Sequence, residues 1–242
     1  LRDLMKVRIK MCGTTRKQDV DAAAALGVDA LGFIFAEKSP RYVTPESARE
    51  LIETIPPFIA RVGVFVDCDL DQVKNITASA GLTQVQLHGR ESVDYCRELK
   101  RWNRSLTVCK SFLVGAEAIE HTLVPYHGVV DCVLFDTYVK GKDGGTGQTF
   151  DWTKLDTRHF DLPMILAGGL NPDNVGEAIK RTAPYAVDVN SGIEDRPGEK
   201  NHDLLARLIA NVRAAETLGM QGITVTADIE AAIEALERLL ES

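Results

Sequence analysis

Short apolar runs alternate along the chain with longer segments in which apolar residues recur every three or four positions. A short run bounded by turn residues is typical of a buried strand, and the longer repeat is typical of a helix that packs on one face. The pattern predicts eight strands alternating with helices, an order typical of a parallel sheet. The expected strands are residues 7–12, 30–35, 61–66, 84–87, 106–112 and 129–135, and the runs that start at Met164 and Ala186.

The helices are signalled with different clarity. Thr44, Pro45 and Glu46 form a typical helix start, with an N-cap, a proline at the first helical position and an acidic first turn. A glycine-rich segment, residues 139–147, is expected to be a mobile lid. The expected helices are residues 19–26, a helix from residue 45, 70–80, 92–101, 173–182 and 202–215, with weaker ones near 117–122 and 152–155.

Polar side chains occupy one alternating face of several expected strands, including Lys10 and Cys12 in the first, Gln86 in the fourth and Asp188 in the eighth. Both faces of a parallel sheet are normally buried, so such groups need partners inside the protein. We therefore expect a closed α/β barrel with a polar interior and an ion pair between Lys10 and Asp188, whose strands become neighbours only on closure. An open sheet is less favoured because no dinucleotide-binding glycine pattern follows strand one. The 242 residues suit a single (βα)8 TIM barrel, typically about 250 long.

The barrel, residues 1–216, is expected to be the catalytic domain, and residues 217–242 form a C-terminal extension. Gly219 and Gly222 are expected to end the last barrel helix. Residues 223–226 would then be a short extended segment, followed by an acidic amphipathic helix. We expect this helix to pack on the outside of the barrel rather than on a second subunit and to stabilise the fold.

Composition restricts the class of protein further. The net charge of -7 and the pI near 5.3 argue against nonspecific nucleic-acid binding. No apolar run reaches the roughly 20 residues that a membrane-spanning helix needs. Five cysteines without a Cys-x-x-Cys pair favour neither a disulfide framework nor a zinc site. We expect a cytoplasmic monomer or homodimer with no nucleic-acid or membrane partner.

The seventh and eighth expected strands both end in turns that contain glycine. Gly168, Gly169 and Gly192 lack a Cβ atom, so their backbone N–H groups are open to close approach by an anion. In TIM barrels the loops after these two strands commonly form a phosphate site. The alternative is two ordinary tight turns. Asn171 and Pro172 are expected to begin the next helix as N-cap and first helical residue.

Catalytic side chains of such barrels project from the C-terminal ends of the strands. Cys12 has this place in strand one, although a cysteine there is often inert packing. Asp136 ends the apolar run of strand six, where a carboxylate is costly unless it is paired or used; the alternative is a loop-capping aspartate. His88 is a candidate acid–base residue or a hydrogen-bonded structural histidine. Arg41 is a candidate for binding a carboxylate, or a solvated loop cation.

Several sequence blocks, in order from about residue 6 to residue 215, resemble the phosphoribosylanthranilate isomerase family. Any one block is weak, but together they cover every expected strand. The blocks are Lys10-Met11-Cys12-Gly13, Gly32-Phe33-Ile34-Phe35 with Ser39-Pro40-Arg41-Tyr42, Arg61-Val62-Gly63-Val64-Phe65-Val66, Val85-Gln86-Leu87-His88-Gly89, Gly144-Gly145-Thr146-Gly147 with Thr149-Phe150-Asp151-Trp152, Ala167-Gly168-Gly169-Leu170-Asn171-Pro172, and Val187-Asp188-Val189 with Ser191-Gly192.

The resemblance implies a single-domain enzyme of tryptophan biosynthesis that needs no metal or cofactor. The family converts the phosphosugar N-(5-phosphoribosyl)anthranilate to 1-(2-carboxyphenylamino)-1-deoxyribulose 5-phosphate by an Amadori rearrangement. By the same resemblance, Asp136 is the general acid, Cys12 is the general base and Arg41 binds the anthranilate carboxylate. The remaining substrate-binding residues implied are His88, Gly168, Gly169, Ser191 and Gly192.

Other interpretations stay open at this point. A histidine-pathway isomerase would carry an aspartate in place of Cys12, and an indole-glycerol-phosphate synthase would need a lysine–glutamate pair at the strand ends. A noncatalytic ligand-binding barrel would have no use for both Cys12 and Asp136. One module of a tryptophan-pathway multienzyme assembly is a further alternative that nothing in the sequence excludes.

Overall fold

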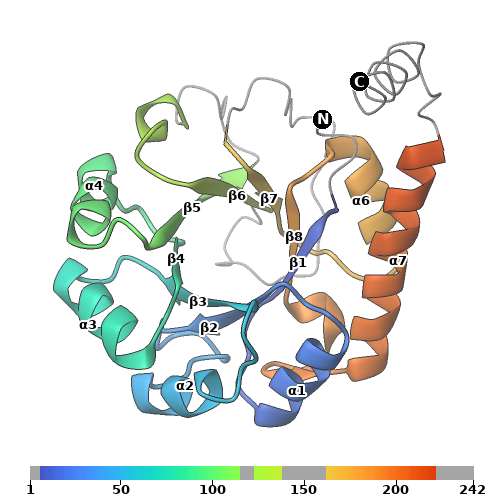
Figure 1. Cartoon of the computed structure of the whole chain (residues 1–242), viewed down its shortest axis with the longest axis horizontal. Coiled ribbons are helices and arrows are strands. Elements are labelled where there is room, and N and C mark those ends of the chain that lie inside the picture. The colour runs from blue at the N-terminus through green and yellow to red at the C-terminus, as the bar shows by residue number, and fades with distance from the viewer. Residues whose placement is uncertain (1–5, 115–122, 138–161, 222–242) are drawn as a thin grey trace, which may run out of the picture.

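Eight parallel strands close into a barrel with helices around it (Figure 1). The computed structural model describes residues 6–114, 123–137 and 162–221. Each strand pairs with the next one along the chain, and β1 closes the barrel by pairing with β8. The strands are β1 (Arg8–Met11), β2 (Ala30–Ile34), β3 (Ala60–Phe65), β4 (Gln84–Leu87), β5 (Thr107–Val114), β6 (Cys132–Thr137), β7 (Met164–Leu166) and β8 (Ala186–Val189). The expected barrel is confirmed.

The described helices follow the strands in alternation and cover the outside of the barrel (Figure 1). Thr44, Asp69 and Ser92 cap the second, third and fourth helices, because each side chain accepts a hydrogen bond from a backbone N–H of the first turn. A hairpin joins the last 3-10 helix to the last α-helix. The elements are α1 (Lys17–Ala25), α2 (Pro45–Ile52), α3 (Leu70–Ala80), α4 (Val93–Trp102), η2 (Val124–Tyr126), α6 (Val175–Thr182), η5 (Ser191–Ile193), β9 (Glu194–Arg196), β10 (Glu199–Lys200) and α7 (His202–Gln221).

Most of the apolar core lies between the sheet and the helices. Ile9 and Met11 are fully buried in this layer, whereas Lys10 between them points into the barrel. Lys10 and Asp188 stand opposite each other in the β1–β8 ladder, and their side chains form an ion pair of 2.8 Å. The pair that we expected from barrel closure is therefore confirmed, and with it the polar character of this part of the interior.

The start of α6 differs from expectation. The helix begins at Val175, and not two residues earlier behind an Asn171 N-cap. The Oδ1 atom of Asn171 accepts hydrogen bonds from the backbone N–H groups of Asp173 and Asn174, which are the contacts expected of an N-cap side chain. Asparagine favours such local turns, so its side chain closes a turn ahead of the helix.

The end of α7 also differs, and the expected break at Gly219 is wrong. The helix continues through that residue to Gln221. A glycine in a helix interior costs about 1 kcal/mol relative to alanine. That cost is too small to end a helix whose preceding turns are anchored by the fully buried Leu205, Leu208 and Val212. The border placed at residue 216 therefore falls inside α7.

Several expectations lie outside the described residues. They are the weak helices near residues 117–122 and 152–155, the lid at residues 139–147, and the extended segment and helix within residues 222–242. Within the described part of the chain, no helix is long and apolar enough to cross a membrane.

Candidate active site

Cys12 directly follows β1 at the carboxyl end of the strand, and it is only 5% exposed. Its side chain packs against Ile34 and Val64 inside the barrel. Gly32 on the neighbouring strand makes room for the sulfur, because a Cβ atom at that position would lie 2.9 Å from Cys12 Sγ. The structure thus places Cys12 in the barrel mouth, with its position set by the small residue beside it.

The charge of Lys10 acts directly on Cys12. The Lys10 ammonium group hydrogen-bonds the Asp188 carboxylate and also lies within hydrogen-bonding reach of the Cys12 thiol. Burial raises the pKa of Cys12, Lys10 opposes this rise, and the negative charge of Asp188 adds to it. Burial is the largest of these effects, so the site favours the thiol, and Lys10 is the group that does most to favour the thiolate.

Asp136 extends from β6 and contacts His88, which follows β4. The Nε2 atom of His88 lies 3.3 Å from Asp136 Oδ2. On the other side of the ring, Nδ1 lies 3.2 Å from the side-chain amide nitrogen of Gln86. With that amide donating to Nδ1, the proton of a neutral His88 resides on Nε2 and points at Asp136. The structure therefore brings two of the predicted residues into one hydrogen-bonded chain.

Asp188 connects the Cys12 side of the interior with the Asp136 side. Burial raises the pKa of Asp188, Lys10 lowers it, and the charge of Asp136 raises it further. Asp188 also interacts electrostatically with Cys12. Its Oδ1 atom is buried and has no hydrogen-bond partner among the described residues. The closed barrel thus gathers charged groups from strands one, six and eight around one interior space.

Arg41 does not extend into solvent as a free loop cation. Its Nε and Nη2 atoms contact the carboxylate of Glu194, at 2.9 Å and 2.6 Å. Lys200 lies on the other side of the same carboxylate, with Nζ 2.8 Å from Glu194 Oε1. Burial alone would raise the pKa of Glu194, but the two cations outweigh it and lower the pKa. Neither Glu194 nor Lys200 is predicted from the sequence, because nothing local links either residue to Arg41.

The two glycine turns contact each other. Gly168 and Gly169 adopt positive φ angles of 88° and 64°, which favour glycine. A Cβ atom on Gly192 would lie 2.0 Å from the carbonyl oxygen of Leu170, so the turn that contains Ser191 and Gly192 packs directly on the first one. The backbone N–H groups of the three glycines donate no hydrogen bond to another described residue. A cluster of N–H groups that have no partner among the described residues is suited to an anion.

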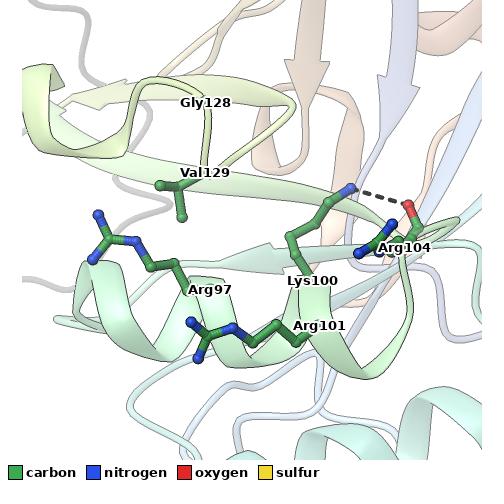
Figure 2. Close-up of a pocket in the computed structure, with 6 residues that line it drawn as sticks. All are labelled: Arg97, Lys100, Arg101, Arg104, Gly128 and Val129. Carbon is green, nitrogen blue, oxygen red and sulfur yellow. Dashed lines mark hydrogen bonds between the residues drawn. The ribbon is translucent and has the colours of Figure 1, made fainter.

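A basic surface pocket lies elsewhere, beside α4 (Figure 2). Three of its cations, Arg97, Lys100 and Arg101, already have acidic partners. The pocket contains none of the predicted site residues, so we assign it no part in the chemistry. No group of three His, Cys, Asp or Glu side chains in the described ranges could hold a metal ion. The residues that line the pocket are Arg97, Lys100, Arg101, Arg104, Gly128 and Val129.

Comparison with known sequences gives a consistent result. The profile of the family described as N-(5'phosphoribosyl)anthranilate (PRA) isomerase matches residues 9–211. The chain is 44% identical over 207 residues to the N-(5'-phosphoribosyl)anthranilate isomerase of Citrifermentans bemidjiense, which covers 85% of this chain and 97% of that protein. It is also 44% identical to the enzyme of the same name from Thermotoga neapolitana, over 86% of this chain and 98% of that protein.

Solved structures agree with the sequence comparison. The crystal structure of phosphoribosyl anthranilate isomerase from Thermotoga maritima has a TM-score of 0.78 and 38% identity, covering 86% of this chain and 99% of that one. A further isomerase structure, in complex with reduced 1-(o-carboxyphenylamino)-1-deoxyribulose 5-phosphate, has a TM-score of 0.76 and 36% identity, with the same coverage. Monomers generated from the dimeric Thermotoga maritima enzyme have also been crystallised.

Proposed function

The chain belongs to the N-(5'-phosphoribosyl)anthranilate isomerase family, and we propose that Cys12 and Asp136 perform its proton transfers at the mouth of the barrel. The protein is an aldose–ketose isomerase of tryptophan biosynthesis. It rearranges N-(5-phosphoribosyl)anthranilate to 1-(2-carboxyphenylamino)-1-deoxyribulose 5-phosphate. The rearrangement moves protons within one substrate, so it requires an acid and a base at fixed places rather than a redox partner.

The substrate carries an anion at each end, and we assign a separate group of residues to each. The phosphate binds the backbone N–H groups of the two glycine turns, at Gly168, Gly169, Ser191 and Gly192. The anthranilate carboxylate binds Arg41. Because both ends are held, the ribose is fixed between the strands that carry Cys12 and Asp136. The reacting atoms then stay close to the acid and the base instead of meeting them by chance.

Asp136 is the proposed general acid. As a carboxylic acid it donates its proton to the furanose ring oxygen, the C1–O bond breaks, and the ring opens to an iminium ion. His88 supports this role because its Nε2 atom lies 3.3 Å from the carboxylate. A neutral imidazole there donates a hydrogen bond to the carboxylate that remains after proton transfer and so stabilises it.

Cys12 is the proposed general base. As a thiolate it removes the proton from C2 of the iminium ion, which gives an enolamine that tautomerises to the ketone. Lys10 supports this role because its ammonium group interacts with the thiol and favours the thiolate. The iminium charge next to C2 also makes that proton more acidic, so a thiol whose pKa is raised by burial is still a suitable base.

The main support for these assignments is that side chains from strands one, six and eight surround the same interior space of the barrel. Asp188 interacts with both Cys12 and Asp136, although the two belong to strands that are not neighbours in the barrel. Acid and base therefore face one space, as an acid–base isomerisation requires. A structural cysteine and a loop-capping aspartate would need no such arrangement.

Turnover of N-(5-phosphoribosyl)anthranilate, followed by loss of anthranilate fluorescence, tests the assignments. We expect Cys12→Ser and Asp136→Asn each to lower kcat by at least about a hundredfold, the scale for a positioned acid or base. Cys68→Ser is the matched control, because Cys68 is free and lies outside the site, near the start of α3. Turnover close to that of the wild type in either site variant would remove that residue from the mechanism.

Three further points remain proposals of the same kind. The protein is a monomer or a homodimer, as both forms occur among the solved isomerases. Its location is the cytoplasm, which the free cysteines suit. Residues 217–242 stabilise the barrel without taking part in the chemistry.

A further inference from the structure

Three charged side chains meet in a buried cluster beside the proposed carboxylate site. Arg41 is 11% exposed, Glu194 is 4% exposed and Lys200 is 0% exposed. Two cations thus share one carboxylate, which leaves the cluster with a net positive charge. Buried charges are costly unless they are paired, so a surplus cation at the edge of a site is suited to an anionic ligand.

The way Glu194 holds Arg41 leaves one edge of the guanidinium group open. Glu194 occupies the side edge, formed by Nε and Nη2. Within the described part of the chain, Nη1 donates no hydrogen bond. A guanidinium group can bind a second carboxylate through the end edge, formed by Nη1 and Nη2, in the same bidentate manner. Glu194 therefore fixes the plane of the guanidinium group without filling the edge that a substrate would use.

Two further contacts hold this arrangement in place. Lys200 donates to Asn190 Oδ1 at 2.9 Å as well as to Glu194. Gly13, the residue after Cys12, lets the Arg41 stem pass closely, because a Cβ atom there would lie 2.6 Å from Arg41 Cδ and 2.8 Å from Asn190 Oδ1. The orientation of Arg41 is thus tied to the segment that carries Cys12 and to the β9–β10 hairpin.

We propose that Glu194, clamped by Lys200, is a positioning residue that aims the end edge of Arg41 at the carboxylate of the substrate and so selects an aryl amine that bears a carboxylate. This inference rests on the proposed function. It assigns roles to Glu194 and Lys200, which do not touch the substrate themselves. The selected chemical class is a 2-carboxyaniline that carries a 5-phosphoribosyl group on its nitrogen, as opposed to the same compound without the carboxylate.

The structure argues against the opposite role, in which Glu194 competes with the substrate for Arg41. A competitor must leave when the substrate binds, but Glu194 is almost fully buried and has a second cation, Lys200, that retains it. Displacement would also leave the buried Lys200 without its carboxylate partner. Removal of the Glu194 charge should accordingly weaken binding of the carboxylated substrate, whereas a competitor would make binding tighter.

The experiment compares two stable ligands and the substrate in Glu194→Gln. The ligands are reduced 1-(o-carboxyphenylamino)-1-deoxyribulose 5-phosphate and its counterpart without the carboxyl group, and their Kd values are measured by calorimetry. We expect the Kd of the carboxylated ligand to rise at least about tenfold, the scale for disturbing a charge-assisted bidentate contact. The Kd of the other ligand should change less than about threefold. The factor by which KM for the substrate rises should be larger than the factor by which kcat falls.

A double-mutant cycle separates positioning from general damage. In an Arg41→Ala background, Glu194→Gln should have almost no further effect on the carboxylated ligand, because the group it aims is gone. Glu199→Gln is the matched control, since Glu199 lies on the same hairpin and pairs with Arg16 and Arg196 instead. If Glu194→Gln does not fold, Glu194→Asp keeps the charge but withdraws it from Arg41, and the same ligand-specific loss is expected.

The outcomes distinguish this inference from the proposed function. Equal loss for both ligands, no loss for either, or tighter binding of the carboxylated ligand would each overturn the positioning role of Glu194. Additive effects of Glu194→Gln and Arg41→Ala would overturn it too. Wild-type protein that fails to turn over N-(5-phosphoribosyl)anthranilate would instead refute the proposed function, whatever the ligand binding shows.

Discussion

Replacement of Lys10 by methionine tests the idea that the polar interior of the barrel is a balanced set of charges. In the wild type, Lys10 Nζ lies 2.8 Å from Asp188 Oδ2, and the two side chains are 6% and 8% exposed. The second oxygen of Asp188 already has no partner among the described residues. Lys10→Met therefore leaves a buried carboxylate in which neither oxygen has a hydrogen-bond partner among the described residues.

The expected cost follows from the burial of the pair. Removal of one partner from a buried ion pair costs about 3–5 kcal/mol, because the remaining charge keeps its desolvation penalty. For a protein of this size, each kcal/mol lowers Tm by about 2–4 °C, so a fall of roughly 6–20 °C is expected. Urea unfolding followed by circular dichroism measures the free energy of unfolding, and a thermal scan measures Tm.

The pH dependence of the loss identifies Asp188 as its source. Burial raises the pKa of Asp188 in the folded protein, and loss of the Lys10 charge raises it further. An acid whose pKa is higher in the folded state binds its proton more tightly there, so protonation stabilises the fold. This stabilisation is lost as the pH rises from the pKa of the unfolded state towards the pKa of the folded state. The deficit of Lys10→Met should therefore be smaller at about pH 5 than at about pH 7.

Two further variants provide the controls. Lys17→Met removes a pair with Asp21 whose side chains are 61% and 56% exposed, and it should cost less than about 0.5 kcal/mol. Lys10→Met combined with Asp188→Leu removes both charges and should regain most of the lost stability. A loss below about 1 kcal/mol for Lys10→Met would refute the reasoning. The reasoning would also be refuted if neither a lower pH nor the added Asp188→Leu substitution reduced the loss of stability.

The remaining predictions concern the base and the phosphate. The residual kcat/KM of Asp136→Asn should rise with pH through an ionisation above the ordinary range of cysteine, because burial raises the pKa of Cys12 and the thiolate is the form that accepts the C2 proton. The wild type is unsuited to this test, because its need for a protonated Asp136 opposes the rise. A profile of the variant that is flat between about pH 7 and 9 would contradict the role of base. Gly192→Ala should raise KM and the inhibition constant of inorganic phosphate by about tenfold or more, because the added Cβ atom would lie 2.0 Å from the Leu170 carbonyl oxygen. Gly176→Ala, whose Cβ atom would meet its nearest neighbour at 3.9 Å, is the control, and equal phosphate inhibition in both variants would contradict a phosphate site at Gly192.

Local pattern was enough to predict the fold and the place of most candidate residues. The strand over residues 84–87 and the helix over residues 70–80 have the predicted bounds, because alternation, caps and glycine stops are encoded within a few residues. The alternation of polar and apolar side chains on β1 and β8 also predicted the Lys10–Asp188 pair, although 178 positions separate the two residues. That prediction succeeded because closure of the barrel fixes which strands are neighbours.

Long-range contacts decided the rest, since each depends on how elements meet and not on local preference. Glu194 lies 153 positions from Arg41, so its hold on the guanidinium group could be recognised only once the hairpin after β8 was in place. Burial of α7 against the barrel outweighs the weak tendency of Gly219 to end it. The sequence by itself therefore determined the barrel, its polar interior and the residues at its mouth. Only the tertiary structure decided that Glu194 and Lys200 pair beside Arg41, because pairing energy depends on distance and burial that a linear pattern does not contain.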